Sequence, residues 1–174
     1  ASSHDLRDTY YDTCDSRLLA SGYAYRRRLD GARTHLTLKG LGDARAGVLH
    51  QREEIEVILT NGETGSSNSL DKRLMALGVK EAMCPVFELQ QQRSERLVMD
   101  HGRQVGTLAM DRIRFSGDEG SLPFVELEFE LDNEGTDGDL QSIVEHLEGI
   151  AGLSPEPVSK FSRGLVLAVD CKTL

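Results

Sequence analysis

Three glutamates alternate with apolar residues in the stretch from Pro123 to Leu131. Successive side chains of an extended strand point to opposite faces, so Glu126, Glu128 and Glu130 share one face. Neighbouring carboxylates repel one another, and they are stable either on an open, solvated face or around a bound cation. On this strand alone the solvated face is the simpler interpretation. The positions of the basic residues are needed to choose between it and a cation site.

Basic residues alternate in the same way in two strand-like segments near the start of the chain. Arg26 and Arg28 share one face of Tyr23–Asp30, and Lys39 lies on the returning segment Arg33–Lys39 after an Asp-Gly hairpin signal. Two adjacent strands therefore place three cations together. An arginine pair on a strand is usually a solvated face, but here the apolar residues on the other side require a core.

The same alternation, with turn signals between the segments, predicts seven strands and four short helices. The predicted strands are Leu6–Asp12, Tyr23–Asp30, Arg33–Lys39, Val48–Leu59, Val86–Met99 (bent or interrupted near Gln92–Glu95), Arg103–Phe115 and Pro123–Leu131. The predicted helices are one turn over Arg17–Ala20, a helix capped by Ser69 and stopped by Gly78, one capped by Asp137 or Asp139 that reaches Gly152, and one capped by Ser159. An antiparallel sheet with one wet face accommodates this pattern, and so does a closed barrel with a charged lumen and outer helices.

The composition is that of one globular domain. The chain has 174 residues without a long linker, and its net charge of −9 argues against a general nucleic-acid binder, whose affinity comes from neutralising phosphates. It has no apolar run of membrane-spanning length and no signal-peptide pattern at its start, so we expect a cytoplasmic protein. Cys14, Cys84 and Cys171 are odd in number and widely spaced, which predicts neither a disulfide framework nor a zinc site.

Six short motifs occur in the order in which they occur in the CYTH superfamily, the triphosphate tunnel metalloenzymes. They are Tyr10-Tyr11-Asp12-Thr13, Arg26-x-Arg28, Leu36-Thr37-Leu38-Lys39, Leu49-His50-Gln51-Arg52-x-Glu54, Glu126-Leu127-Glu128-Phe129-Glu130-Leu131 and Ser159-Lys160-Phe161-x-Arg163-Gly164. Each motif is weak alone, but six in order are specific. The chain therefore resembles this superfamily, and the Leu-His-Gln-Arg motif looks most like the bacterial inorganic triphosphatases.

The resemblance implies an α+β, mainly antiparallel β fold: an eight-stranded barrel or tunnel with helices packed outside. The family begins with a strand carrying Glu-x-Glu-x-Lys, followed by a helix, and this spacing does not occur in residues 1–174. We therefore expect seven of the eight strands here, in a single CYTH-like domain over residues 1–174 that lacks its first strand and helix.

The resemblance also assigns the site. The expected triphosphate-binding positions are Arg26, Arg28, Lys39, Arg93 and Lys160, with Arg163 as a less certain sixth. Arginine forks grip phosphate oxygens bidentately, whereas lysines act as compact charges. Glu126 and Glu128 are the expected ligands of Mg²⁺ or Mn²⁺, hard cations that take oxygens from carboxylate and phosphate together. Glu54 and Asp111 are expected as catalytic carboxylates that add a ligand or orient the site.

The expected activity is metal-dependent hydrolysis of inorganic triphosphate (tripolyphosphate) to phosphate and diphosphate. Thiamine triphosphate, RNA 5′-triphosphate and ATP cyclisation stay open as variants on the same scaffold. A non-catalytic polyphosphate- or nucleotide-binding module and an interaction protein with an acidic sheet face are the alternatives from other classes. We expect a small-molecule triphosphate partner and neither nucleic acid nor membrane, and a homodimer stays open.

Overall fold

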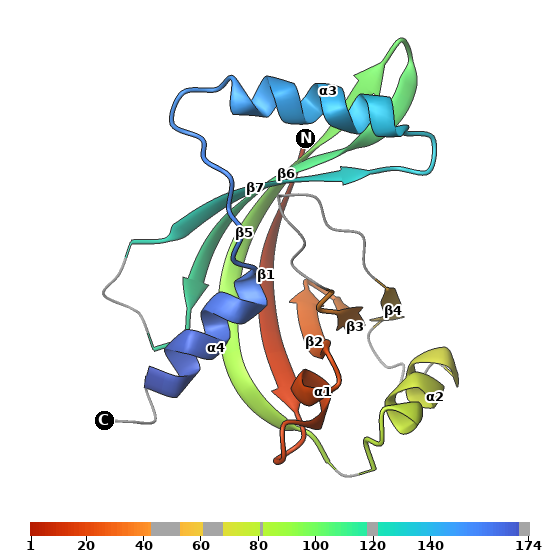
Figure 1. Cartoon of the computed structure of the whole chain (residues 1–174), viewed down its shortest axis with the longest axis vertical. Coiled ribbons are helices and arrows are strands. Elements are labelled where there is room, and N and C mark those ends of the chain that lie inside the picture. Colours follow the sequence, from red (N-terminus) through yellow and green to blue (C-terminus); the bar gives the residue numbers. More distant parts are fainter. Residues whose placement is uncertain (43–52, 61–67, 81, 118–121, 171–174) are drawn as a thin grey trace.

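The computed structural model describes residues 1–42, 53–60, 68–80, 82–117 and 122–170, which form seven strands and four helices (Figure 1). The strands are β1 (Ser2–Asp12), β2 (Tyr23–Asp30), β3 (Arg33–Gly40), β4 (Glu54–Thr60), β5 (Cys84–Asp100), β6 (Arg103–Phe115) and β7 (Phe124–Leu131). The helices are α1 (Arg17–Ala20), α2 (Asn68–Ala76), α3 (Asp137–Glu148) and α4 (Lys160–Asp170). The seven strands predicted from alternation are confirmed, as is the α+β class.

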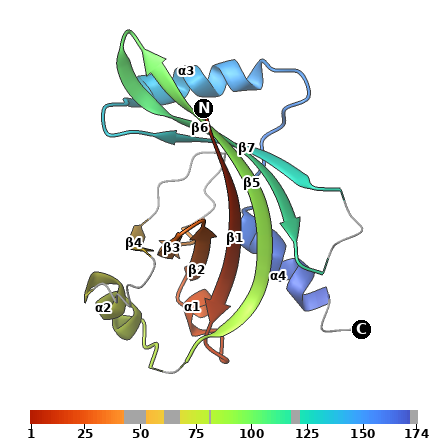
Figure 2. The same ribbon diagram turned by 180° about the vertical axis from the view of Figure 1, so that it is seen from behind.

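The strands form one antiparallel sheet in the order β4-β3-β2-β1-β5-β6-β7. The sheet is strongly curved, and β1, β5 and β6 arch along its length (Figures 1 and 2). Within the part of the chain that the structure describes, β4 and β7 are its two edges and do not pair with each other. The sheet is therefore open here, with the curvature of a tunnel wall.

Strand register brings side chains of one parity onto a single face. Asp8 pairs with Arg28, Arg93 pairs with Asp111, and Asp111 pairs in turn with Glu126. We call this side the charged face. Its members used below are Asp8, Arg26, Arg28, His35, Thr37, Lys39, Glu54, Glu56, Gln91, Arg93, Asp111, Glu126 and Glu128.

The opposite face of β2 and β3 is apolar and lies under two helices. Leu18 of α1 and Leu70 of α2 pack with Tyr25 and Leu38 in one buried cluster. Tyr25 and Leu38 directly neighbour Arg26 and Thr37 in their strands, so the two pairs point to opposite faces. Because Tyr25 and Leu38 are buried under the helices, Arg26 and Thr37 lie on the charged face. The arrangement of apolar residues under outer helices is confirmed for this half of the sheet.

Helix α4 packs on the charged face itself, not on the outer one. Its Phe161 is buried in a second cluster with Tyr10, Leu89, Ile113 and Phe115, residues that occupy one end of the charged face. Figure 1 shows α4 lying across β5. Consequently the first turn of α4 reaches the charged residues further along the sheet.

Several local predictions can be compared with the observed elements. The predicted interruption of β5 near Gln92–Glu95 is wrong: the strand is continuous, and its pairing with β6 shifts only between Val98 and Met99. The residues change from apolar to charged at this point because the strand passes from the apolar cluster to the charged residues, and the strand itself continues. Of the strand predicted over 48–59, residues 48–52 and most of the Leu-His-Gln-Arg motif lie outside the described residues.

The helix caps differ more. Helix α2 starts at Asn68, one residue before the predicted cap Ser69. Thr136, not Asp137 or Asp139, caps α3: its hydroxyl accepts a hydrogen bond from the Asp139 backbone N–H, and the Asp139 carboxylate accepts one from the Thr136 backbone N–H, which makes a capping box. The prediction for α4 is confirmed, since Ser159 Oγ accepts a hydrogen bond from the backbone N–H of Ser162.

Candidate metal and phosphate site

Three carboxylates converge where β6 and β7 pair. Asp111 is opposite Glu126 in the ladder, Glu128 is two residues further along the same face, and one oxygen from each lies within 4.8 Å of the others. Asp111 is fully buried, and the Glu126 side chain is 13% exposed. Three negative charges so close together with little solvent are unstable without cations among them.

Lys160 supplies the first of these cations. Its Nζ lies 2.9 Å from Asp111 Oδ2, 2.8 Å from Glu126 Oε2 and 2.7 Å from Glu128 Oε1. The contact with Glu126 is an ion pair without good hydrogen-bond geometry, whereas Lys160 donates a hydrogen bond to Glu128. Because Lys160 is the first residue of α4, the cap at Ser159 and the packing of Phe161 fix its position.

Arg93 supplies the second cation. Its Nε and one terminal nitrogen donate to the two oxygens of Asp111, at 2.8 and 2.7 Å, and the same terminal nitrogen donates to Glu128 at 2.7 Å. The bidentate geometry fixes the guanidinium plane, and the side chain is only 12% exposed. Asp111 therefore orients Arg93, and Glu128 bridges Arg93 and Lys160.

The surroundings move the carboxylate pKa values in different directions. Burial raises the pKa of Glu126, and the nearby charge of Lys160 only partly offsets this. Burial also acts to raise the pKa values of Asp111 and Glu128, but the hydrogen bonds and charges of Arg93 and Lys160 outweigh it and leave both below their usual range. Two glutamates on one strand therefore differ in proton affinity, as occurs where acid and base roles are divided.

This donor set fits a hard divalent cation. Mg²⁺ and Mn²⁺ bind carboxylate oxygens, and three of these converge here. The ammonium of Lys160 contacts the same three carboxylates that would hold such a cation. A bound metal and Lys160 would therefore compete for these oxygens unless an anion also draws Lys160.

A second ion-pair group lies across β1 and β2. Arg28 donates two hydrogen bonds of 2.8 Å to the fully buried Asp8, and a terminal nitrogen of Arg26 lies 3.8 Å from the same carboxylate. Arg26 also donates to Thr37, whose hydroxyl donates to Glu56. Asp8 was not among the predicted site residues, although it alternates with Arg7 and Thr9 and so lies on the charged face.

The two groups are close enough to act on one buried hydroxyl. The pKa of Tyr10 is raised by burial and is modified by the charges of Arg26, Asp8, Arg28 and Lys160.

Several polar atoms of this face are buried without a hydrogen-bond partner: Arg26 Nε, His35 Nε2 and Gln91 Oε1. A buried polar atom without a hydrogen-bond partner is uncommon, and a bound polar ligand is one explanation for it.

Three predicted residues lie apart from these groups. Glu54 pairs with Lys39 at 2.9 Å on the β3–β4 edge, and four strands lie between β4 and the strand of Asp111 in the sheet order. Arg163 donates to Glu156 at 2.8 Å and stacks on the Phe124 ring. The structure thus gathers Arg93, Asp111, Glu126, Glu128 and Lys160 in one group and Arg26 and Arg28 in the other.

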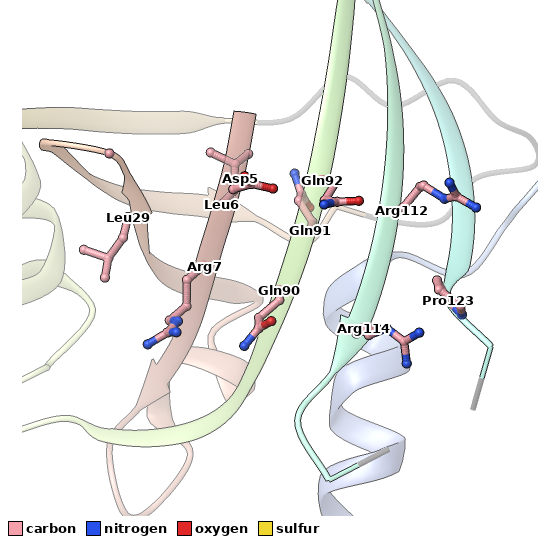
Figure 3. Close-up of a pocket in the computed structure, with 11 residues that line it drawn as sticks. Asp5, Leu6, Arg7, Leu29, Gln90, Gln91, Gln92, Arg112, Arg114 and Pro123 are labelled. Carbon is pink, nitrogen blue, oxygen red and sulfur yellow. The ribbon is translucent and has the colours of Figure 1, made fainter. Parts of the chain in front are cut away.

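A groove on the opposite face does not contain these residues (Figure 3). It is lined mainly by side chains of β1, β5 and β6 that point away from the charged face. Among them, Gln90 pairs with Arg7 on one side and with Arg114 on the other. Arg112 and Gln92 form the next row. Its basic residues face away from the carboxylate group, so it is separate from the candidate site.

Comparison with known proteins supports the resemblance. The profile of the CYTH domain matches residues 1–164. A comparison with curated proteins finds no relative of matching sequence. In the described residues, none of the helices combines the length and apolarity needed to cross a bilayer.

Solved structures share the fold at low sequence identity. A candidate adenylate cyclase from Bacillus halodurans is 20% identical with a TM-score of 0.63, covering 92% of this chain and 82% of that one. A candidate adenylyl cyclase from Hippeastrum, described as having a dominant triphosphatase activity, is 17% identical with a TM-score of 0.64, covering 94% and 82%. A protein from Pyrococcus horikoshii is 19% identical with a TM-score of 0.52, covering 99% and 86%. With the family profile matched over most of its length, the chain belongs to the CYTH domain family.

Proposed function

We propose that this protein hydrolyses inorganic triphosphate to phosphate and diphosphate with Mg²⁺ or Mn²⁺. The observation that carries the proposal is the group formed by Asp111, Glu126, Glu128, Arg93 and Lys160, in which carboxylates and cations alternate within 2.7–2.9 Å. A triphosphate is an anion and its metal is a cation, so a site for both needs basic residues for the phosphates and carboxylates for the metal.

Basic residues of the charged face would bind the anion. Arg26, Arg28 and Arg93 offer guanidinium forks, and Lys160 offers a compact charge beside the carboxylates. Arg28 and Arg93 are already held by Asp8 and Asp111, so their remaining donors are oriented before a ligand arrives. Such fixed donors stabilise charge on a transferring phosphoryl group without reorganisation.

Glu126 and Glu128 would hold the divalent cation, with Asp111 beside them. When bound, the cation neutralises charge on the phosphate oxygens and lowers the pKa of a bound water. The attacking water also needs a proton acceptor, a role for a carboxylate of this group that does not hold the cation. Water attacks the terminal phosphorus, the phosphoanhydride bond breaks, and diphosphate leaves.

Adenylate cyclisation is the second candidate, because two structures of this fold are described as candidate adenylyl cyclases. Purified protein should be given tripolyphosphate, thiamine triphosphate or ATP, each with Mg²⁺, Mn²⁺ or chelator. Metal-dependent phosphate release that is fastest with tripolyphosphate would support the proposal. Cyclic AMP as the main product would support the cyclase instead.

Binding without turnover needs a separate measurement. Calorimetric titration of tripolyphosphate under the same conditions distinguishes a non-catalytic binding module from an inactive protein. Tight binding with no phosphate release in either metal would contradict the hydrolase proposal.

A further inference from the structure

We propose that Cys14 and Cys84 form an oxidisable dithiol, a modification site that takes a peroxide or a small-molecule disulfide as its oxidant. Their Sγ atoms lie 3.4 Å apart, although the two residues are 70 positions apart in the chain. Both side chains are exposed. The inference does not depend on the proposed hydrolase function.

The fold brings the two sulfurs together through contacts that do not involve them. Asp12, the last residue of β1, pairs with Cys84, the first residue of β5. Cys14 follows two residues after Asp12, in the turn that leads to α1. The register of two long, adjacent strands therefore places both cysteines at the same end of the sheet.

Buried hydrogen bonds fix the turn that carries Cys14. The Asp12 carboxylate accepts hydrogen bonds from the backbone N–H groups of Thr13, Leu18 and Leu19, at 2.7, 2.9 and 3.0 Å. The Thr13 hydroxyl accepts another from Arg17 N–H at 2.9 Å. Asp12 and Thr13 are both buried, so the turn holds its shape without help from the thiols.

The geometry favours oxidation over metal binding. Zinc takes four ligands in structural sites, whereas in the described residues the grouped metal-type side chains are Asp111, Glu126 and Glu128, with neither cysteine among them. A disulfide needs sulfurs about 2.05 Å apart, so the observed pair must approach by roughly 1.4 Å, a movement within reach of side-chain rotation. Exposure gives the oxidant access to both.

The reaction balances for either oxidant. With a peroxide, one thiolate attacks the peroxide oxygen and forms a sulfenic acid while an alcohol or water leaves. The second thiol then attacks that sulfur, forming the disulfide and releasing water. With a small-molecule disulfide, two exchange steps form the protein disulfide and release two small thiols.

The bond would close a ring that contains α1, β2, β3, β4 and α2. This segment carries Arg26, Arg28 and Lys39, so the cross-link would tie the basic half of the sheet to β5. A ring of this length restricts the unfolded chain strongly, and the melting temperature should rise by roughly 5–10 °C if the bond forms without strain.

The test uses a Cys171→Ser background, which leaves Cys14 and Cys84 as the thiols. Protein treated with hydrogen peroxide or oxidised glutathione should form no intermolecular disulfide, become lighter by two hydrogen atoms, resist alkylation and give one peptide pair joined through Cys14 and Cys84. Dithiothreitol should restore both thiols. The matched controls Cys14→Ser and Cys84→Ser should instead leave a single thiol, which forms a mixed disulfide with oxidised glutathione and a sulfenic or higher acid with peroxide.

Two results would overturn the proposal. One is oxidised protein in which Cys14 and Cys84 are still alkylated, or are found only in mixed or intermolecular disulfides. The other is an intramolecular bond that lowers the melting temperature, since this would show that the fold does not preposition the two sulfurs.

Discussion

The ammonium nitrogen of Lys160 lies 2.7 Å from Oε1 of Glu128 and joins the first turn of α4 to strand β7. The pKa of Lys160 is raised because the charges of Glu128, Asp111 and Glu126 outweigh the effect of burial, which acts in the opposite direction. The lysine thus stabilises three carboxylates that would otherwise repel one another, and it holds α4 on the charged face.

Replacing Lys160 by methionine should make the protein depend on a divalent cation for stability. Without the ammonium the three carboxylates repel one another, so the melting temperature should fall without metal and recover more on adding Mg²⁺ or Mn²⁺ than in the wild type. Thermal unfolding with metal and with chelator measures this. Arg163→Met is the matched control, because Arg163 is on the same helix but pairs with Glu156. If the metal raises the melting temperature of both variants equally, Lys160 and the metal do not bind the same carboxylates.

Glu126→Gln or Glu128→Gln should lower metal-dependent turnover of tripolyphosphate by about 100-fold or more, since each change removes a ligand charge but little volume. Binding of triphosphate without metal should be retained or improved, because one repulsive carboxylate is gone. Phosphate release and calorimetry measure the two effects. Glu130→Gln, an exposed residue on the same strand and face, is the control. Wild-type turnover in both ligand variants would remove the metal site from β7.

Arg28→Ala should destabilise the fold as well as weaken binding. It would leave the fully buried Asp8 carboxylate without its bidentate partner, and breaking a buried ion pair costs about 3–5 kcal/mol. Chemical denaturation measures the loss. Arg27→Ala, an exposed neighbour on the opposite face, should change stability by less than about 0.5 kcal/mol. Adding Asp8→Asn to Arg28→Ala should recover part of the stability; if it lowers stability further, the pair is not coupled as described.

Gly164→Ala should loosen α4 from the sheet. Gly164 is buried, and a Cβ atom there would overlap the ring of Phe87. Such overpacking costs about 1–3 kcal/mol and should also weaken the contact between Lys160 and its carboxylates. Gly138→Ala in α3 has ordinary space and is the control. Unchanged stability in Gly164→Ala would mean that α4 does not pack this closely.

The contribution of Asp139 to stability should depend on pH. Its pKa is held well below the usual 3.8 by hydrogen bonds from Arg103 and Thr136. A depressed folded-state pKa contributes stability above the unfolded value, and that stability is lost as pH falls through the folded value. The difference in melting temperature between wild type and Asp139→Asn should thus be largest above about pH 5 and shrink at lower pH. A difference independent of pH would show that the charge of Asp139 does not contribute.

Local patterns in the amino-acid sequence were enough to predict the strands and the face on which their charges lie. Period-two alternation is local, so Arg26, Arg28, Glu126 and Glu128 could be assigned to one parity without knowing the sheet. Ordered motifs identified the family, and the profile match over residues 1–164 confirms it. Local capping signals were less certain, because Thr136, Asp137 and Asp139 compete within one turn and the reciprocal bond decides between them.

Which charges meet depends on the folded chain and could not be predicted from local patterns. Residues that pair across strands are set by register and sheet order, and these put Arg93 beside Asp111 but leave Glu54 with Lys39 at the far edge. The position of α4 on the charged face depends on the packing of Phe161 and on the absence of a side chain at Gly164, which no periodicity reveals. The same holds for Cys14 and Cys84, because 70 residues of chain separate sulfurs that the β1–β5 ladder places 3.4 Å apart.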